Sequence, residues 1–94
     1  MFLEHLHILY KIIDLAKAQY PDRLDLINAL ENCIDGYWSN HCYYQFVDSR
    51  NANQPDSDWQ FQDSFRIEQR RGGTIVVDLL KSGKIGGIEF LDLN

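Results

Sequence analysis

The spacing of hydrophobic residues changes along the chain from a helical period to strand alternation. Across residues 2–19, apolar side chains recur every three or four positions, which is typical of an amphipathic helix: Phe2, Leu6, Leu9, Ile13, Ala16 and Tyr20. Pro21 interrupts this pattern because a proline ring disfavours the α conformation of the preceding residue. The first helix is therefore expected to end near residue 20.

A second helix is expected to open at residues 21–23 and to stop at Gly36, a residue suited to the left-handed conformation that ends helices. Its expected buried stripe is Leu26, Ile27, Leu30, Cys33 and Ile34. Two helices joined by so short a break should form an antiparallel pair.

After the helices the apolar period falls to two residues, which predicts β-strands. Residues 38–47 are expected to form one strand, residues 48–58 a loop, and residues 58–70 a half-buried strand. In this last strand one face is expected to consist mainly of apolar residues: Trp59, Phe61, Phe65 and Ile67.

The last residues carry the clearest fold signal. Two β-branched runs, 74–80 and 85–91, flank a turn in which Gly83 can adopt a positive φ, so we predict a β-hairpin. Its main core residues should be Ile75, Val77, Ile88 and Phe90. The whole chain, residues 1–94, is expected to be a single α+β domain. In it, an N-terminal antiparallel helix pair packs on one face of a four-stranded antiparallel β-meander, in the order ααββββ.

Composition and charge narrow the function classes. Fourteen acidic and nine basic residues give a net charge of −5, which argues against a protein that binds nucleic acid by neutralising phosphates. No run approaches the about 20 apolar residues that cross a bilayer, and no export pattern opens the chain, so we expect a cytoplasmic protein without a membrane partner. It should be a monomer, or a homodimer built through an open sheet edge at the first or last strand.

The sequence contains no recognisable catalytic or metal-binding motif. Cys33 and Cys42 fit neither a disulfide scaffold nor a four-ligand zinc site, and free thiols are expected. His5 and His7 would point about 200° apart on a helix and cannot chelate together. We therefore expect no metal, no cofactor and no enzymatic activity. The alternative is a small-molecule-binding or enzymatic domain, with a pocket between helices and sheet lined by Tyr44, His41 and Asp63.

Acidic residues gather on the helices and the long loop, beside aromatic residues that we expect to be exposed: Tyr37, Trp38, Tyr43 and Trp59. Acids at an interface steer a basic partner, and aromatic residues anchor it. The predicted partner-binding residues are Asp35, Tyr43, Asp48, Asp56, Asp58 and Trp59. The competing interpretation is an ordinary solvated acidic face that keeps the protein soluble.

Two segments carry resemblances. Residues 74–78 and 83–91 resemble the closing hairpin of several small uncharacterised bacterial domains, which implies fold alone. The segment Cys33-Ile-Asp-Gly-Tyr-Trp38 is similar to small immunity proteins of bacterial toxin systems. Such proteins bind a cognate toxin, often a nuclease, and block it without catalysis. The resemblance implies a protein that neutralises a basic toxin domain by occlusion.

Overall fold

A computed structural model describes residues 2–93, with side chains described for residues 7–92. The predicted core positions Phe2 and Leu6, and also His5, lie outside the described side chains. The chain forms α1 (Phe2–Gln19), α2 (Leu24–Glu31), β1 (Tyr37–Trp38), β2 (Tyr43–Gln45), β3 (Phe61–Glu68), β4 (Thr74–Leu80), β5 (Ile85–Phe90) and a final 3₁₀ turn, η1 (Leu91–Leu93). Within residues 2–93, no helix has both the length and the apolar character needed to span a membrane.

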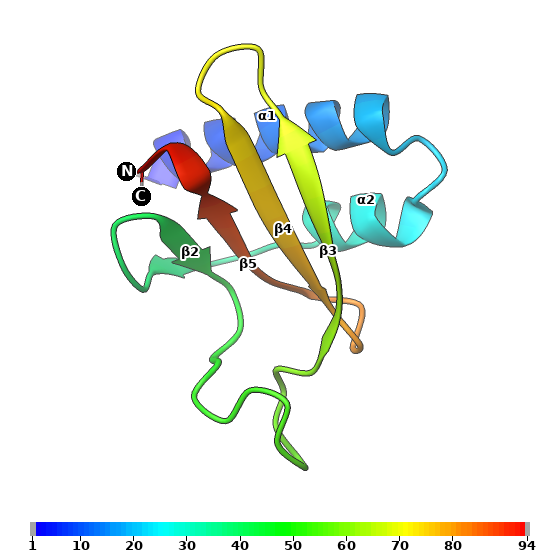
Figure 1. Cartoon of the computed structure of the whole chain (residues 1–94), viewed down its shortest axis with the longest axis vertical. Coiled ribbons are helices and arrows are strands. Elements are labelled where there is room, and N and C mark those ends of the chain that lie inside the picture. Colours follow the sequence, from blue (N-terminus) through cyan, green and yellow to red (C-terminus); the bar gives the residue numbers. More distant parts are fainter. Residues whose placement is uncertain (1, 94) are drawn as a thin grey trace.

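The five strands form one antiparallel sheet, and both helices lie behind it in Figure 1, on the same face. We call the other face the open face. The prediction of an α+β fold with an antiparallel sheet is confirmed. The hairpin of β4 and β5 also forms, and Gly83 in its turn has a φ of +88°.

The predicted strand at residues 38–47 is wrong in one respect, because it is two short strands joined by a turn. The Asn40 side-chain oxygen accepts hydrogen bonds from the backbone N–H groups of Cys42 and Tyr43, both at 2.9 Å. An asparagine that binds the backbone two or three residues ahead closes a turn, which explains the break between β1 and β2.

The predicted meander is also wrong, since the strand order is β1-β2-β5-β4-β3. The last strand lies inside the sheet, between β2 and β4, and cannot serve as an open edge. After β2 the chain instead crosses to the far edge through residues 46–60, the crossing loop, which hangs below the sheet in Figure 1. The two edge strands are β1 and β3.

The core lies between the helices and the sheet. Its side chains are almost fully enclosed, and they come from both helices and from β3, β4 and β5: Ile12, Leu26, Leu30, Ile67, Ile75, Val77, Leu79, Ile85 and Ile88. Ile75, Val77 and Ile88 are thus core residues as predicted, while Phe90 is half-buried and packs at the margin.

The second helix is shorter than predicted. It ends at Glu31 rather than near Gly36, and the Asn32 backbone N–H closes its last turn on the Asn28 and Ala29 carbonyls. Ile34 consequently lies beyond the helix and is 80% exposed, although the helical period placed it in the buried stripe.

Phe61, which the alternation placed on the apolar face of its strand, is not part of the core. It is 40% exposed because the β3–β4 register shifts between Phe61 and Asp63, and a bulge moves the preceding side chain to the other face. Asp63 lies after the bulge and opposite the core residue Leu79, so it shares the helix-side face, where Arg23 lies 3.6 Å from its carboxylate.

Candidate functional site

The crossing loop is folded by its own polar side chains. The Asp48 carboxylate accepts a hydrogen bond from the Arg50 backbone and pairs with the Arg50 guanidinium at 2.7 Å. Asn53 and Asp56 have left-handed φ values of 64° and 68°, which aspartate and asparagine tolerate better than most residues. Asp48 is therefore partly neutralised, whereas Asp56 stands at an exposed turn of the loop.

Trp59 attaches the end of the crossing loop to the sheet. Its ring lies so close to Gly86 that a Cβ there would come within 2.7 Å of the indole nitrogen. The same ring stacks on Phe61, with centroids 6.3 Å apart. Its indole N–H is buried without a hydrogen-bond partner. Trp59, predicted to bind a partner, is thus half-buried and instead holds the crossing loop against the sheet.

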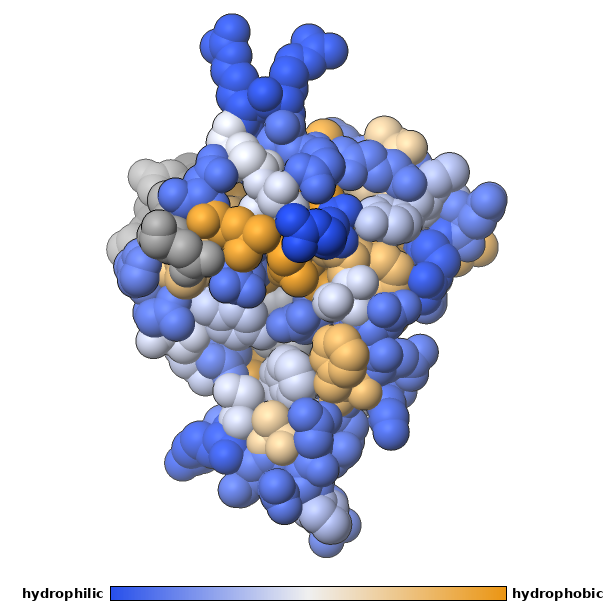
Figure 2. Space-filling model, viewed as in Figure 1, coloured by the Kyte–Doolittle hydropathy of each residue, from blue (hydrophilic) through white to orange (hydrophobic). Residues whose placement is uncertain are grey.

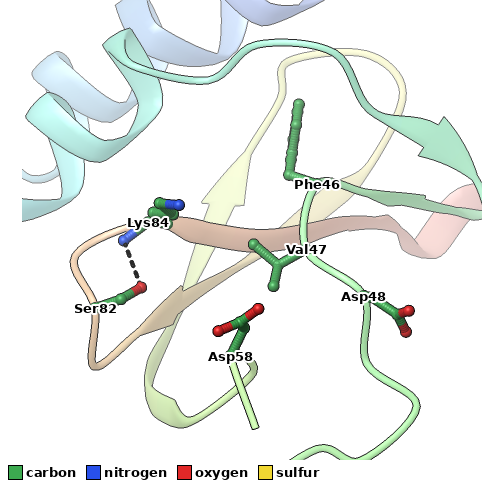
Figure 3. A pocket seen from close by; sticks show the side chains of 6 residues that line it. All are labelled: Phe46, Val47, Asp48, Asp58, Ser82 and Lys84. Atoms are coloured by element: carbon green, nitrogen blue, oxygen red, sulfur yellow. Dashed lines mark hydrogen bonds between the residues drawn. The ribbon is translucent and has the colours of Figure 1, made fainter.

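A hollow of about 330 Å³ lies between the crossing loop and the β4–β5 turn. Figure 3 shows Asp58 directed toward its centre, below Val47, while the Asp48 carboxylate lies at one margin. The complete lining is Phe46, Val47, Asp48, Asp58, Ser82 and Lys84. The structure therefore brings together two of the predicted site residues, Asp48 and Asp58, beside an apolar floor.

Tyr43 lies apart from this hollow, on the open face of the sheet. Its hydroxyl donates to an Asp78 carboxylate oxygen at 2.8 Å, and its ring lies over Gly87, where an added Cβ would collide with the ring unless Tyr43 moved. Burial raises the pKa of Asp78; the Tyr43 hydrogen bond lowers it and Glu89 raises it. Burial, together with Asp78, also raises the pKa of Tyr43, so the hydroxyl stays a donor. Figure 2 shows this face as a mixture of polar and apolar groups.

The most exposed apolar residues near β1 are absent from the predicted site. Ile34, Tyr37 and Trp38 are 80%, 51% and 42% exposed, and we call them the edge patch. Asp35, a predicted site residue, lies within the same short segment and is itself exposed. Tyr37 and Trp38 are exposed as predicted, and they stay uncovered because β1 is an edge strand.

Ring contacts connect the edge patch to the hollow. The Trp38 ring meets Tyr44 edge-on with centroids 5.2 Å apart, and Tyr44 meets Phe46 in the same way at 5.2 Å. Phe46 in turn lines the hollow. A chain of ring contacts therefore connects the edge patch to a residue that lines the hollow.

The residues of the alternative pocket do not converge. His41 is exposed in the β1–β2 turn, Tyr44 belongs to the aromatic row, and Asp63 lies on β3 at the opposite edge of the sheet. Both cysteines are free thiols as predicted, and burial raises the pKa of Cys33 to about 12. Among the described residues, no group of three or more His, Cys, Asp or Glu side chains could hold a metal ion.

In comparisons with protein-family models, curated proteins and solved structures, nothing matches this chain.

Proposed function

We propose that this protein is a non-enzymatic protein-binding module of the cytoplasm, an immunity-type protein that neutralises a basic, nuclease-type toxin by covering it. The observation that carries the proposal is the continuous row from Trp38 through Tyr44 and Phe46 to the hollow with Asp58. Aromatic residues are enriched at protein–protein interfaces and often carry much of the binding energy, and acids around them would steer a basic partner.

Charge on this surface is available to a partner. Of the salt bridges among the described side chains, none involves Asp35, Asp56 or Asp58. All three are exposed. Lysine and arginine side chains of a toxin domain would therefore find carboxylates that take part in no salt bridge, and these local charges would steer the approach.

The first test measures the rate at which this protein associates with the product of the neighbouring open reading frame, which is obtained by co-expression with this protein. The double variant Asp56→Lys/Asp58→Lys should slow association about tenfold or more and weaken its salt dependence. The control, Asp14→Lys/Asp22→Lys, makes the same change of charge on exposed residues near the helices and should keep the wild-type rate. An on-rate indifferent to salt and to both variants contradicts a steering role for the acidic loop.

The second test concerns the aromatic anchors. Truncation of Trp38 or Tyr37 to alanine should accelerate dissociation, at a cost of about 2 kcal/mol for a central anchor. Tyr43→Phe should leave dissociation unchanged, because the Tyr43 hydroxyl is already bound to Asp78. Protection of cells that express the partner should be lost in parallel with binding. Full protection by a variant that no longer binds would exclude occlusion as the mechanism.

A further inference from the structure

The β3 strand is eight residues long and lies at the edge of the sheet. One side of its backbone is hydrogen-bonded to β4, so its other side would be open to any extended chain. Exposed strand edges of this length recruit further strands, since the backbone groups of any chain can pair with them. The outer side of β3 is, however, already occupied by side chains.

Gln19, the last residue of α1, binds the backbone of Glu68 twice. Its side-chain nitrogen donates to the Glu68 carbonyl at 2.7 Å, and its side-chain oxygen accepts from the Glu68 N–H at 2.9 Å. A carboxamide carries one donor group and one acceptor in a plane, as a peptide group does. Gln19 thus takes the place that a neighbouring strand would take.

Tyr20 occupies the next outward group along the strand. Its hydroxyl donates to the Arg66 carbonyl at 2.8 Å, while its ring packs edge-on against Phe65 with centroids 5.2 Å apart. The Arg23 guanidinium covers the same Phe65 ring at 4.5 Å. The end of α1 and the start of α2 are therefore held against β3 by packing as well as by hydrogen bonds.

In the first half of β3, two outward N–H groups are also bound by side chains. The Ser64 N–H donates to the Asp63 carboxylate at 2.9 Å, and the Phe61 N–H donates to the Asn53 side chain at 2.9 Å. Side chains from α1, from the crossing loop and from the strand itself thus share the outer edge of β3. We call Gln19 and Tyr20 the edge guard.

We propose that the outer edge of β3 is a latent strand-addition site for a second copy of this chain, held closed by the edge guard. A second copy presents the same eight-residue edge and can pair with it antiparallel. Arg66 and Glu68 have opposite charges and are both exposed, so the strand does not present the uniform charge that would repel its own copy. Opening the edge guard converts a monomer into a dimer joined through β3.

The experiment measures mass by sedimentation velocity, on the full chain, over a wide range of concentrations. The variant Gln19→Ala/Tyr20→Phe keeps the ring on Phe65 but removes all three hydrogen bonds, and it should shift toward dimer as concentration rises. The control Gln54→Ala/Tyr10→Phe changes the same residue types at exposed positions outside β3 and the edge guard, and it should remain a monomer.

A third variant shows where the copies meet. Arg66 sends its carbonyl outward to Tyr20, and in an antiparallel strand its N–H points the same way. Adding Arg66→Pro to the variant Gln19→Ala/Tyr20→Phe (the guard variant) removes that N–H donor. An edge strand tolerates proline at such a position, and the change should restore the monomer. If the guard variant dimerises equally well with and without Arg66→Pro, the copies pair elsewhere and the proposal is overturned.

A guard variant that is folded, as judged by far-UV circular dichroism, and monomeric at every concentration also overturns it. If the double variant does not fold, Gln19→Ala alone is measured instead. It truncates an exposed side chain and removes the two hydrogen bonds to Glu68. In that variant the Glu68 amide should exchange with solvent about tenfold faster below the dimerisation range. Unchanged exchange together with unchanged mass contradicts the guard.

Discussion

At the scale of single residues, Tyr43 and Asp78 define the polar centre of the open face. Tyr43→Phe removes the hydrogen bond to a half-buried carboxylate and should destabilise the protein by about 1–2 kcal/mol near neutral pH. Urea denaturation measures the change. Leaving the free energy of unfolding unaltered would mean that solvent replaces the tyrosine hydroxyl at no cost.

The companion variant Asp78→Asn should behave in the opposite way. A carboxyl whose pKa is raised by burial stabilises the fold when protonated, and this contribution is lost as the pH rises through its folded-state pKa. Asparagine keeps an acceptor for Tyr43 and removes the charge. We expect a neutral to slightly stabilising effect at neutral pH, under about 1 kcal/mol because the group is half exposed, and a wild-type advantage that appears only in acid.

Cys33 should be chemically inert in the folded protein. Burial raises the pKa of its thiol to about 12, and the sulfur donates to the Ala29 carbonyl at 3.5 Å. Since the thiolate is the reactive form, alkylation by iodoacetamide at mildly alkaline pH should be far slower in the native than in the unfolded state. Mass spectrometry of native samples that shows rapid modification of Cys33 would contradict this packing.

At the scale of elements, the crossing loop depends on one glycine. A Cβ on Gly86 would press on the Trp59 ring at 2.7 Å and on the Leu80 side chain at 2.9 Å. Gly86→Ala should therefore lift Trp59 from the sheet, at a cost of about 1–3 kcal/mol. The shift of the Trp59 indole signal in NMR spectra, with faster amide exchange confined to residues 46–60, is the expected readout.

Gly83→Ala is the matched control in the same hairpin. A Cβ there meets nothing within 4 Å, but the φ of +88° is unfavourable for alanine. The expected loss is about 1 kcal/mol, without any shift of the Trp59 indole signal. An equal effect of the two variants on the indole signal would contradict the packing of Trp59 on Gly86.

Most of the helices and strands could be predicted from the sequence, but the order of the strands in the sheet could not. Alternation identified β3 and β4, and the β-branched run after the Gly83 turn identified β5. Alternation says nothing about which strand lies beside which, and β5 pairs with β2 through backbone contacts that any extended segment could make. The long stretch after residue 47 was the available signal, since a meander needs only a short turn there.

The candidate site, too, could be predicted only in part from the sequence. Asp48 and Asp58 lie at the two ends of a predicted loop, and they do meet at one hollow. Tyr43 was expected to be a free aromatic anchor, but the alternation could not reveal that Gly87 leaves room for its ring beside Asp78. The exposure of Tyr37 and Trp38 was expected from the sequence and is confirmed, although neither was included among the partner-binding residues.

At the scale of the whole molecule, α1, α2 and the sheet share one core and should unfold together. Leu30 on α2 is fully enclosed among residues of that core, whereas Ile34, one helical turn later in the sequence, is 80% exposed. Leu30→Ala should cost about 2–5 kcal/mol, and Ile34→Ala should cost less than about 0.5 kcal/mol.

The two variants separate stability from binding. Far-UV circular dichroism and near-UV aromatic signals of Leu30→Ala should shift to lower urea concentration by the same amount, because no element retains a core of its own. Ile34→Ala should unfold like the wild type and yet release a bound partner faster, since its side chain belongs to the edge patch. Separate transitions for the helices and the sheet would contradict a shared core, and a strongly destabilised Ile34→Ala would show that this side chain is buried after all.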